Sequence, residues 1–339
     1  EAYRYFIYGQ KAFYNKDIST AKDWYLKAIK NDSSYFGANL MLGWTYSSLG
    51  MMEQAKKLCL KIYRDKDKMY PAQQFAVGNL YTRLFGTPQD QIDNLRQSMV
   101  LDDQVPIEYY MLGGDYSSLY LFDKAIPEYE KALEIFNKWG SKPMWINNYT
   151  ELGYAYHQTG QYKKEKKLYT KAEQDFPNDP DLIYRQAILS LSERDTITAN
   201  AYIKKYLSIN KENALSEAEN KSWLGTLYNE AGIPDKAEAY FRQALKLQPE
   251  DPDILNNLAY FQIDKDRNIN EGIELIDKAL ASDSENYSYL HTKGWGLYRV
   301  GKYKEALAFL EKSWGLKTWW DQELCLHLEA AKKTVANIK

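Results

Sequence analysis

The residues that could carry out chemistry are few and scattered along this chain. None of the three histidines, His157, His291 and His327, has a cysteine or carboxylate beside it at the spacing of a metal site. No HExxH, GxSxG or GxxxxGK[ST] motif occurs, and the one GxG, Gly294 to Gly296, lacks the third glycine of a dinucleotide-binding loop. Acidic residues abound, but a catalytic carboxylate pair needs a concave apolar pocket that a sequence cannot show. We therefore expect no enzymatic activity, no metal site and no cofactor.

The charge balance also narrows the kinds of partner. The chain has 44 lysines and arginines against 46 aspartates and glutamates, a formal net charge of −2. Duplex nucleic acid requires a basic footprint, so we expect no nucleic-acid partner. No run of 18 apolar residues occurs, so we expect no membrane-spanning segment.

Small residues recur at an almost fixed interval, and this interval is the strongest signal in the chain. The recurring positions are separated by 34 to 40 residues and are Gly9, Gly43, Gly78, Gly113, Gly153, Ala187, Gly225, Ala259 and Gly294. A second small residue follows most of them by twelve positions, at Ala21, Ala55, Ala125, Ala199, Ala237 and Ala306. A period near 34 residues is typical of arrays built from helix-turn-helix units. The sequence therefore predicts nine copies of one helical hairpin.

The seventh copy shows how each hairpin is specified. Apolar residues from Leu224 to Ala244 follow three- and four-residue steps, which places them on one stripe of each of two helices. Gly232 is suited to end the first helix, Pro234 can open the second, and Pro249 prevents further helix. We expect the small residues Gly225, on the first helix, and Ala237, on the second, to let the two helices approach closely. By the same logic, a leucine at Gly43 should overpack the second hairpin.

This pattern resembles the tetratricopeptide repeat, whose consensus has an aromatic or apolar opening, Leu-Gly, a tyrosine, then alanine, phenylalanine, alanine and a closing proline. The match covers about residues 2 to 316, with departures at Ser33, Cys59 and Glu165 and with extra residues from Trp139 to Pro143. The ninth copy resembles the final repeat of many bacterial members of the family. The resemblance implies an all-α fold, an α-solenoid of about nine repeats in a right-handed superhelix.

We place the limits of the repeats and of a terminal helix as follows. The predicted array spans residues 1–318, with repeats near 2–35, 36–69, 70–104, 105–144, 145–178, 179–213, 214–250, 251–285 and 286–318. Residues 319–339 are predicted to form a C-terminal capping helix, with Leu324, Leu326, Leu328 and Ala331 on its apolar face. Cys59 and Cys325 fall at opposite ends of this array, so we expect two buried thiols and no disulfide.

In the family, the first helix of each repeat lines a concave wall on which extended or helical peptides bind. Alignment to the motif places an aromatic-rich set of residues on that wall. The set is Trp44, Phe75, Asn79, Arg83, Tyr110, Tyr154, His157, Tyr184, Asn256, Tyr260, His291, Trp295 and Tyr298, with Tyr3, Phe6 and Phe13 at the amino end. Each of these aromatic residues could equally fill a gap between repeats.

The resemblance implies a non-catalytic scaffold or adaptor that binds a peptide or protein partner in this aromatic groove. A glycan-binding accessory protein that uses the same rings as stacking platforms is the alternative. The amino end is apolar and has no predicted cap, so self-association through it is a third interpretation. The chain begins at Glu1 rather than Met, so we expect that an upstream segment was removed, and an exported or periplasmic location stays open.

Overall fold

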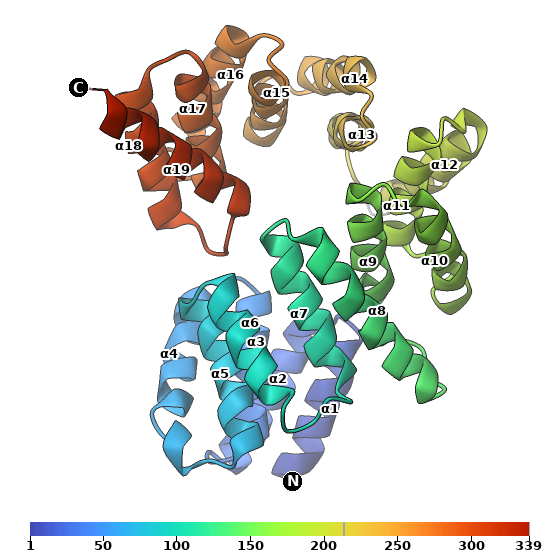
Figure 1. Cartoon of the computed structure of the whole chain (residues 1–339), viewed down its shortest axis with the longest axis vertical. Helices are drawn as coiled ribbons and strands as arrows, with labels where there is room; N and C mark the ends of the chain where they lie inside the picture. Colours follow the sequence, from blue (N-terminus) through green and yellow to red (C-terminus); the bar gives the residue numbers. More distant parts are fainter. Residues whose placement is uncertain (213, 339) are drawn as a thin grey trace. The chain divides into compact units, whose positions relative to one another are not determined.

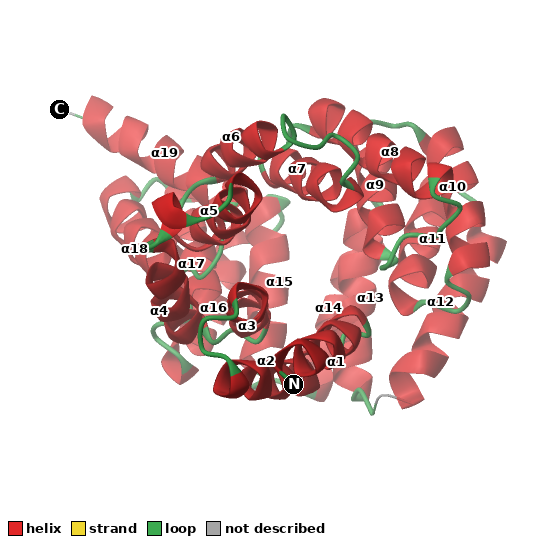
Figure 2. Cartoon of the chain, turned by 90° about the horizontal axis from the view of Figure 1, so that it is seen from below, coloured by secondary structure: helices red, strands yellow, loops and turns green. Residues whose placement is uncertain are grey.

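The computed structural model describes residues 1–212 and 214–338, and every regular element in them is helical (Figures 1 and 2). This confirms the all-α prediction. The chain divides into two compact units, Glu1–Thr159 and Gly160–Lys339, which are described separately below.

The N-terminal unit contains nine α-helices and one short 3₁₀ helix among its described residues. These are α1 (Ala2–Tyr14), α2 (Ile18–Asn31), α3 (Phe36–Ser48), α4 (Met52–Tyr63), η1 (Lys66–Lys68), α5 (Pro71–Phe85), α6 (Pro88–Ser98), α7 (Pro106–Ser118), α8 (Phe122–Lys138) and α9 (Asn147–Gln158).

The C-terminal unit contains ten α-helices among its described residues. They are α10 (Tyr162–Asp175), α11 (Pro180–Ser192), α12 (Thr196–Glu212), α13 (Glu217–Glu230), α14 (Pro234–Leu247), α15 (Pro252–Asp264), α16 (Ile269–Ser282), α17 (Tyr287–Arg299), α18 (Tyr303–Leu316) and α19 (Gln322–Asn337).

The helix ends follow the turn chemistry of the sequence. Helix α13 ends at Glu230, Gly232 has a φ of +70°, and Pro234 is the first residue of α14. A positive φ suits glycine, which has no Cβ, and proline at the first helical position loses no hydrogen bond. The predicted turn of the seventh hairpin is therefore confirmed.

Within a hairpin, a large side chain of the second helix lies directly over the glycine of the first. A Cβ on Gly225 would stand 2.5 Å from the Phe241 ring, and a Cβ on Gly9 would stand 2.5 Å from the Tyr25 ring. Such distances are far below van der Waals contact, so only glycine allows the two helices to come this close. The side chain over Gly225 is thus the Phe241 ring, and Ala237 of the same hairpin is fully buried.

The second and third hairpins have a smaller side chain where the ring would stand. Cys59 occupies this position in the second hairpin, and a Cβ on Gly43 would meet Leu80 of α5 at 2.6 Å. A leucine at Gly43 is therefore still expected to overpack the structure, but its clash is with Leu80 of the next repeat and not with the second helix of its own hairpin. In the third hairpin the position is Asn94, whose side-chain oxygen lies against Gly78.

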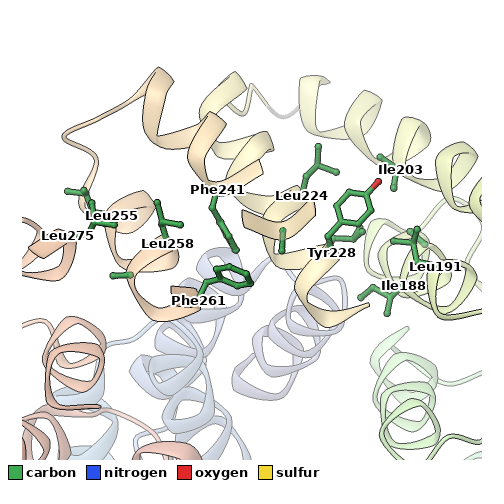
Figure 3. Close-up of a cluster of buried hydrophobic side chains, with 14 of the residues drawn as sticks. Ile188, Leu191, Ile203, Leu224, Tyr228, Phe241, Leu255, Leu258, Phe261 and Leu275 are labelled. Carbon is green, nitrogen blue, oxygen red and sulfur yellow. The ribbon is translucent and has the colours of Figure 1, made fainter. Parts of the chain in front are cut away.

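The clearest apolar core lies in the C-terminal unit and joins successive hairpins (Figure 3). It runs from Ala187 in α11 to Tyr289 in α17, and Phe241 packs on Phe261 of the following repeat with ring centroids 5.4 Å apart. Each hairpin thus buries its apolar face against its neighbours, as expected for stacked repeats.

Two smaller predictions about the C-terminal unit need correction. Leu324, Leu328 and Ala331 of α19 are buried with Leu310 of α18, but Leu326 is 46 % exposed, because it lies two residues from Leu324 and so on another face of the helix. The cysteines are both free, but Cys325 is only half-buried whereas Cys59 is buried.

Gly225 tests the packing within a hairpin. Gly225→Leu should lower the free energy of unfolding by about 1–3 kcal/mol, because the new side chain displaces the Phe241 ring. Gly315→Ala is the matched control, since a Cβ there meets no atom within 4 Å, and it should leave stability unchanged or raised by about 0.5–1 kcal/mol. Urea unfolding measures both, and equal stability of the two variants would contradict the packing account.

Candidate partner-binding surface

The residues predicted to line a groove all lie on the first helices of the hairpins, which carry odd numbers. In the N-terminal unit these are α3 with Trp44, α5 with Phe75, Asn79 and Arg83, α7 with Tyr110, and α9 with Tyr154 and His157. In the C-terminal unit they are α11 with Tyr184, α15 with Asn256 and Tyr260, and α17 with His291, Trp295 and Tyr298.

In the N-terminal unit, most of these side chains are half-buried and Arg83 is exposed. Trp44 packs against the apolar cluster between α4 and α5, and the Tyr154 ring meets Phe122 edge-on at 5.6 Å. Tyr110 lies 5.9 Å from the Tyr129 ring of its own hairpin. These rings therefore contribute to packing while part of each stays accessible.

Polar side chains interrupt the apolar packing of α5, α6 and α7. The Nδ2 of Asn94 donates to the carbonyl of Phe75 at 3.2 Å and to the side-chain oxygen of Asn79. Asp115 of α7 is 4 % exposed, and its Oδ2 accepts no hydrogen bond from the described residues.

Asp115 occupies a position at which several repeats have a buried apolar residue. It stands two residues after Gly113, and the equivalent residues after Gly78 and Gly225 are the buried Leu80 and Leu227, whereas the first two repeats have Lys11 and Thr45. Burial raises the pKa of the Asp115 carboxyl to about 7, and the positive charge of Arg83 opposes this rise. Sequence reasoning missed this residue, although aligning the positions after each glycine would have found it.

The charges around Asp115 come from three odd-numbered helices. Burial raises the pKa of Tyr110, and the negative charge of Glu151 in α9 raises it further, whereas Arg83 in α5 lowers it. Arg83, Tyr110, Asp115 and Glu151 are therefore close enough to influence one another. Two acidic groups, one guanidinium and one phenol form an electrostatically coupled set on α5, α7 and α9.

In the C-terminal unit, the predicted residues join neighbouring helices. Hydrogen bonds link residues 35 or 36 positions apart on successive odd-numbered helices, and they connect Ser222 with Asn257, Asp253 with Tyr289, Asn256 with Thr292, Ile263 with Arg299, His291 with His327, and Tyr298 with Thr334. Asn256 and His291 are buried as a result.

Helix α19 covers Trp295. The ring of His327 stacks on Trp295 with centroids 3.6 Å apart and an interplanar angle of 4°, and its Nδ1 lies 2.9 Å from Nε2 of His291. Burial lowers the pKa of His291, and it lowers the pKa of His327 to about 3 with a further contribution from the charges of His291 and Arg299.

Tyr184 belongs to a separate aromatic group. Its hydroxyl donates to Glu230 of α13 at 2.6 Å. The Trp223 and Tyr206 rings lie beside Tyr184 and stack on each other with centroids 3.8 Å apart. Trp223, Tyr206 and His327 were all missed as members of these groups, since the sequence does not show which helices face one another.

The described residues contain no group of three His, Cys, Asp or Glu side chains that could hold a metal ion. None of the described helices is both long enough and apolar enough to cross a bilayer.

Comparison with known proteins identifies the architecture. The hairpin stack defines the class of α-helical repeat proteins. One tetratricopeptide repeat model matches residues 36–64 and 146–174, and a second tetratricopeptide repeat model matches residues 218–261. The chain thus contains tetratricopeptide repeats. Such repeats support a protein-interaction scaffold in general.

Solved structures share the fold at low sequence identity. The crystal structure of the APC/C hetero-tetramer Cut9–Hcn1 is 17 % identical with a TM-score of 0.53, and the match covers 83 % of this chain and 52 % of that one. This chain therefore spans about half of the chain it matches. The crystal structure of yeast Tom70 is 15 % identical with a TM-score of 0.48, and the match covers 99 % of this chain and 89 % of that one. Pseudomonas aeruginosa PilF is 19 % identical with a TM-score of 0.47, and the match covers 68 % of this chain and 97 % of that one. No curated protein matches the sequence.

Asp115 should make stability depend on pH. Its folded pKa of about 7 lies above the unfolded value, so the folded state binds more protons between about pH 4 and 7, and stability falls as pH rises through that window. Asp115→Asn should therefore raise the free energy of unfolding at pH 8 by up to about 4 kcal/mol and change it little at pH 3.5. Urea unfolding at both pH values checks this, and a difference that is the same at both would show that burial of the charge is not the cause.

The pair His291 and His327 should make stability depend on pH in the opposite direction. The folded pKa of His327, about 3, lies below the unfolded value, so the unfolded state binds more protons and stability is lost as pH falls from about 6.5. His327→Gln, which does not titrate, should flatten this part of the stability profile. Chemical unfolding of the wild type and the variant from pH 4 to 8 provides the measurement, and identical slopes would refute the assignment.

Proposed function

We propose that this chain is a non-catalytic scaffold that binds a peptide or protein segment along the odd-numbered helices of its N-terminal unit. The proposed contact residues are Trp44, Phe75, Asn79, Arg83, Tyr110, Tyr154 and His157. Tryptophan, tyrosine and arginine provide most of the binding energy at protein interfaces, because they bury a large area at a low cost in side-chain entropy.

The observation that carries this proposal is the buried carboxyl of Asp115, which interacts electrostatically with the exposed Arg83. A carboxyl whose Oδ2 accepts no hydrogen bond from the described residues, at a position where the third and seventh repeats have a buried leucine, lowers the stability of the fold. Local rules of packing are typically broken where function requires it, and perturbed ionisable groups cluster at such sites. Asp115 lies on α7, the helix that also carries Tyr110, and Arg83 lies on the preceding odd-numbered helix, α5.

The predicted residues of the C-terminal unit are a weaker basis for a partner site. His327 covers one face of Trp295, Tyr298 is bonded to Thr334, and Asn256 is bonded to Thr292. The same side chains thus hold successive helices together. Tyr184, Tyr260 and His291 remain predicted contact residues, as does self-association through the amino end.

Selection of peptides from a displayed random library against the immobilised chain tests the proposal. A selected peptide should bind in isothermal titration calorimetry, and Tyr110→Ala and Arg83→Ala should each weaken binding by about 1 kcal/mol or more. Trp139→Ala is the control, because Trp139 is a 57 % exposed aromatic residue outside the odd-numbered helices. It should leave the affinity unchanged.

Two results would overturn this assignment. Equal affinity of the wild type, Tyr110→Ala and Arg83→Ala, at unchanged thermal stability, would remove the N-terminal surface from the site. Saturable quenching of tryptophan fluorescence by oligosaccharides, with no peptide recovered from the library, would favour the glycan-binding alternative.

A further inference from the structure

Two segments at opposite ends of the N-terminal unit are in direct contact. The indole Nε1 of Trp145 donates a 3.2 Å hydrogen bond to the carbonyl of Tyr14, which lies 131 residues earlier in the chain. The two rings also meet, with centroids 5.8 Å apart and an interplanar angle of 51°. We call this pair of contacts the clasp.

The carbonyl of Tyr14 is available because of the way α1 ends. The last carbonyls of a helix have no partner within it. The turn after α1 satisfies three of them, since Asn15 donates to Lys11 and Ala12, Asp17 donates to Ala12, and Lys16 donates to Phe13. Tyr14 is the final residue of α1, and its carbonyl accepts from the Trp145 side chain instead.

The lengthened connection after α8 delivers Trp145. This connection includes the extra residues Trp139 to Pro143, and Ser141 donates a backbone hydrogen bond to Phe136 that folds it back on α8. Trp145 then leads directly into α9, where its own carbonyl accepts from the backbone and side-chain nitrogens of the buried Asn148. The main chain that carries the indole is therefore anchored at the start of α9.

The clasp joins two turns that a straight stack would keep apart. Successive helices of the stack are antiparallel, so turns after odd-numbered helices lie at one end and turns after even-numbered helices lie at the other. Tyr14 immediately precedes the turn after the odd-numbered helix α1, and Trp145 lies near the end of the connection after the even-numbered helix α8. The hairpins from α1 to α8 must therefore both curl and shift along the axis of the curl, so that the end of α1 meets the start of α9.

We propose that the clasp closes the N-terminal unit on itself and restrains its curvature. The connection between α8 and α9 carries the closing residue, Trp145. A single solvent-exposed hydrogen bond and one tilted ring pair form the clasp, whereas neighbouring repeats are joined by buried apolar contacts. The clasp is thus the contact of this unit that opens most easily.

Pulsed electron spin resonance tests the closure in the full chain. Nitroxide labels are placed at Ser19→Cys in α2 and Asn137→Cys in α8, both exposed positions, in a Cys325→Ser background. The remaining Cys59 is buried, and burial raises the pKa of its thiol to about 12, so it stays unlabelled. The distance distribution should be narrow in the wild type and in Trp139→Ala.

Trp145→Ala should give a broader distribution with a longer mean distance. Trp145→Phe keeps a ring but loses the N–H donor, so its distribution should fall between those of the wild type and Trp145→Ala. Circular dichroism melts confirm that each variant is folded. A distribution for Trp145→Ala that matches the wild type would overturn the closure, because it would show that the clasp does not hold the unit.

Discussion

The close contact between a glycine on one helix and a large side chain on the next is the constraint on which this fold depends. In the first, fourth and seventh hairpins a ring lies over the glycine, and in the ninth Leu310 lies over Gly294. This contact fixes the separation of the two helices and leaves their remaining apolar side chains without a partner inside the hairpin. Stacking then follows, because only a neighbouring hairpin can bury those side chains.

The sequence predicted the hairpins well because their determinants are local. Helical periodicity, a glycine with positive φ and a proline at the first helical position all act within a few residues, as the α13–α14 turn shows. What the sequence does not show is which repeat supplies a neighbour. A Cβ on Gly43 would meet Leu80 of the next repeat and not the second helix of its own hairpin.

The candidate site was less predictable for a related reason. A residue on an odd-numbered helix can face the inner surface or the next odd-numbered helix, and the two directions are close in angle. His291 and Asn256 match the motif of the groove, yet each bonds to a residue 36 positions away. Only coordinates reveal that His327 of α19 reaches Trp295. Asp115, in contrast, could have been found from its spacing to Gly113.

The two units differ in how they join consecutive repeats, and this difference bears on where a partner would act. From α11 to α17 an apolar cluster connects the hairpins, which resists rearrangement because each displaced side chain exposes area to water. Between the third and fourth hairpins the apolar cluster is smaller, with Ile92 and Leu95 of α6 against Leu112 of α7. In the same two hairpins Asn94 stands where other hairpins have a ring, and Asp115 is a buried carboxyl. This joint buries less apolar area, so a change in its curvature exposes less area to water. The clasp between Tyr14 and Trp145 joins the two ends of the same unit and so restrains that curvature.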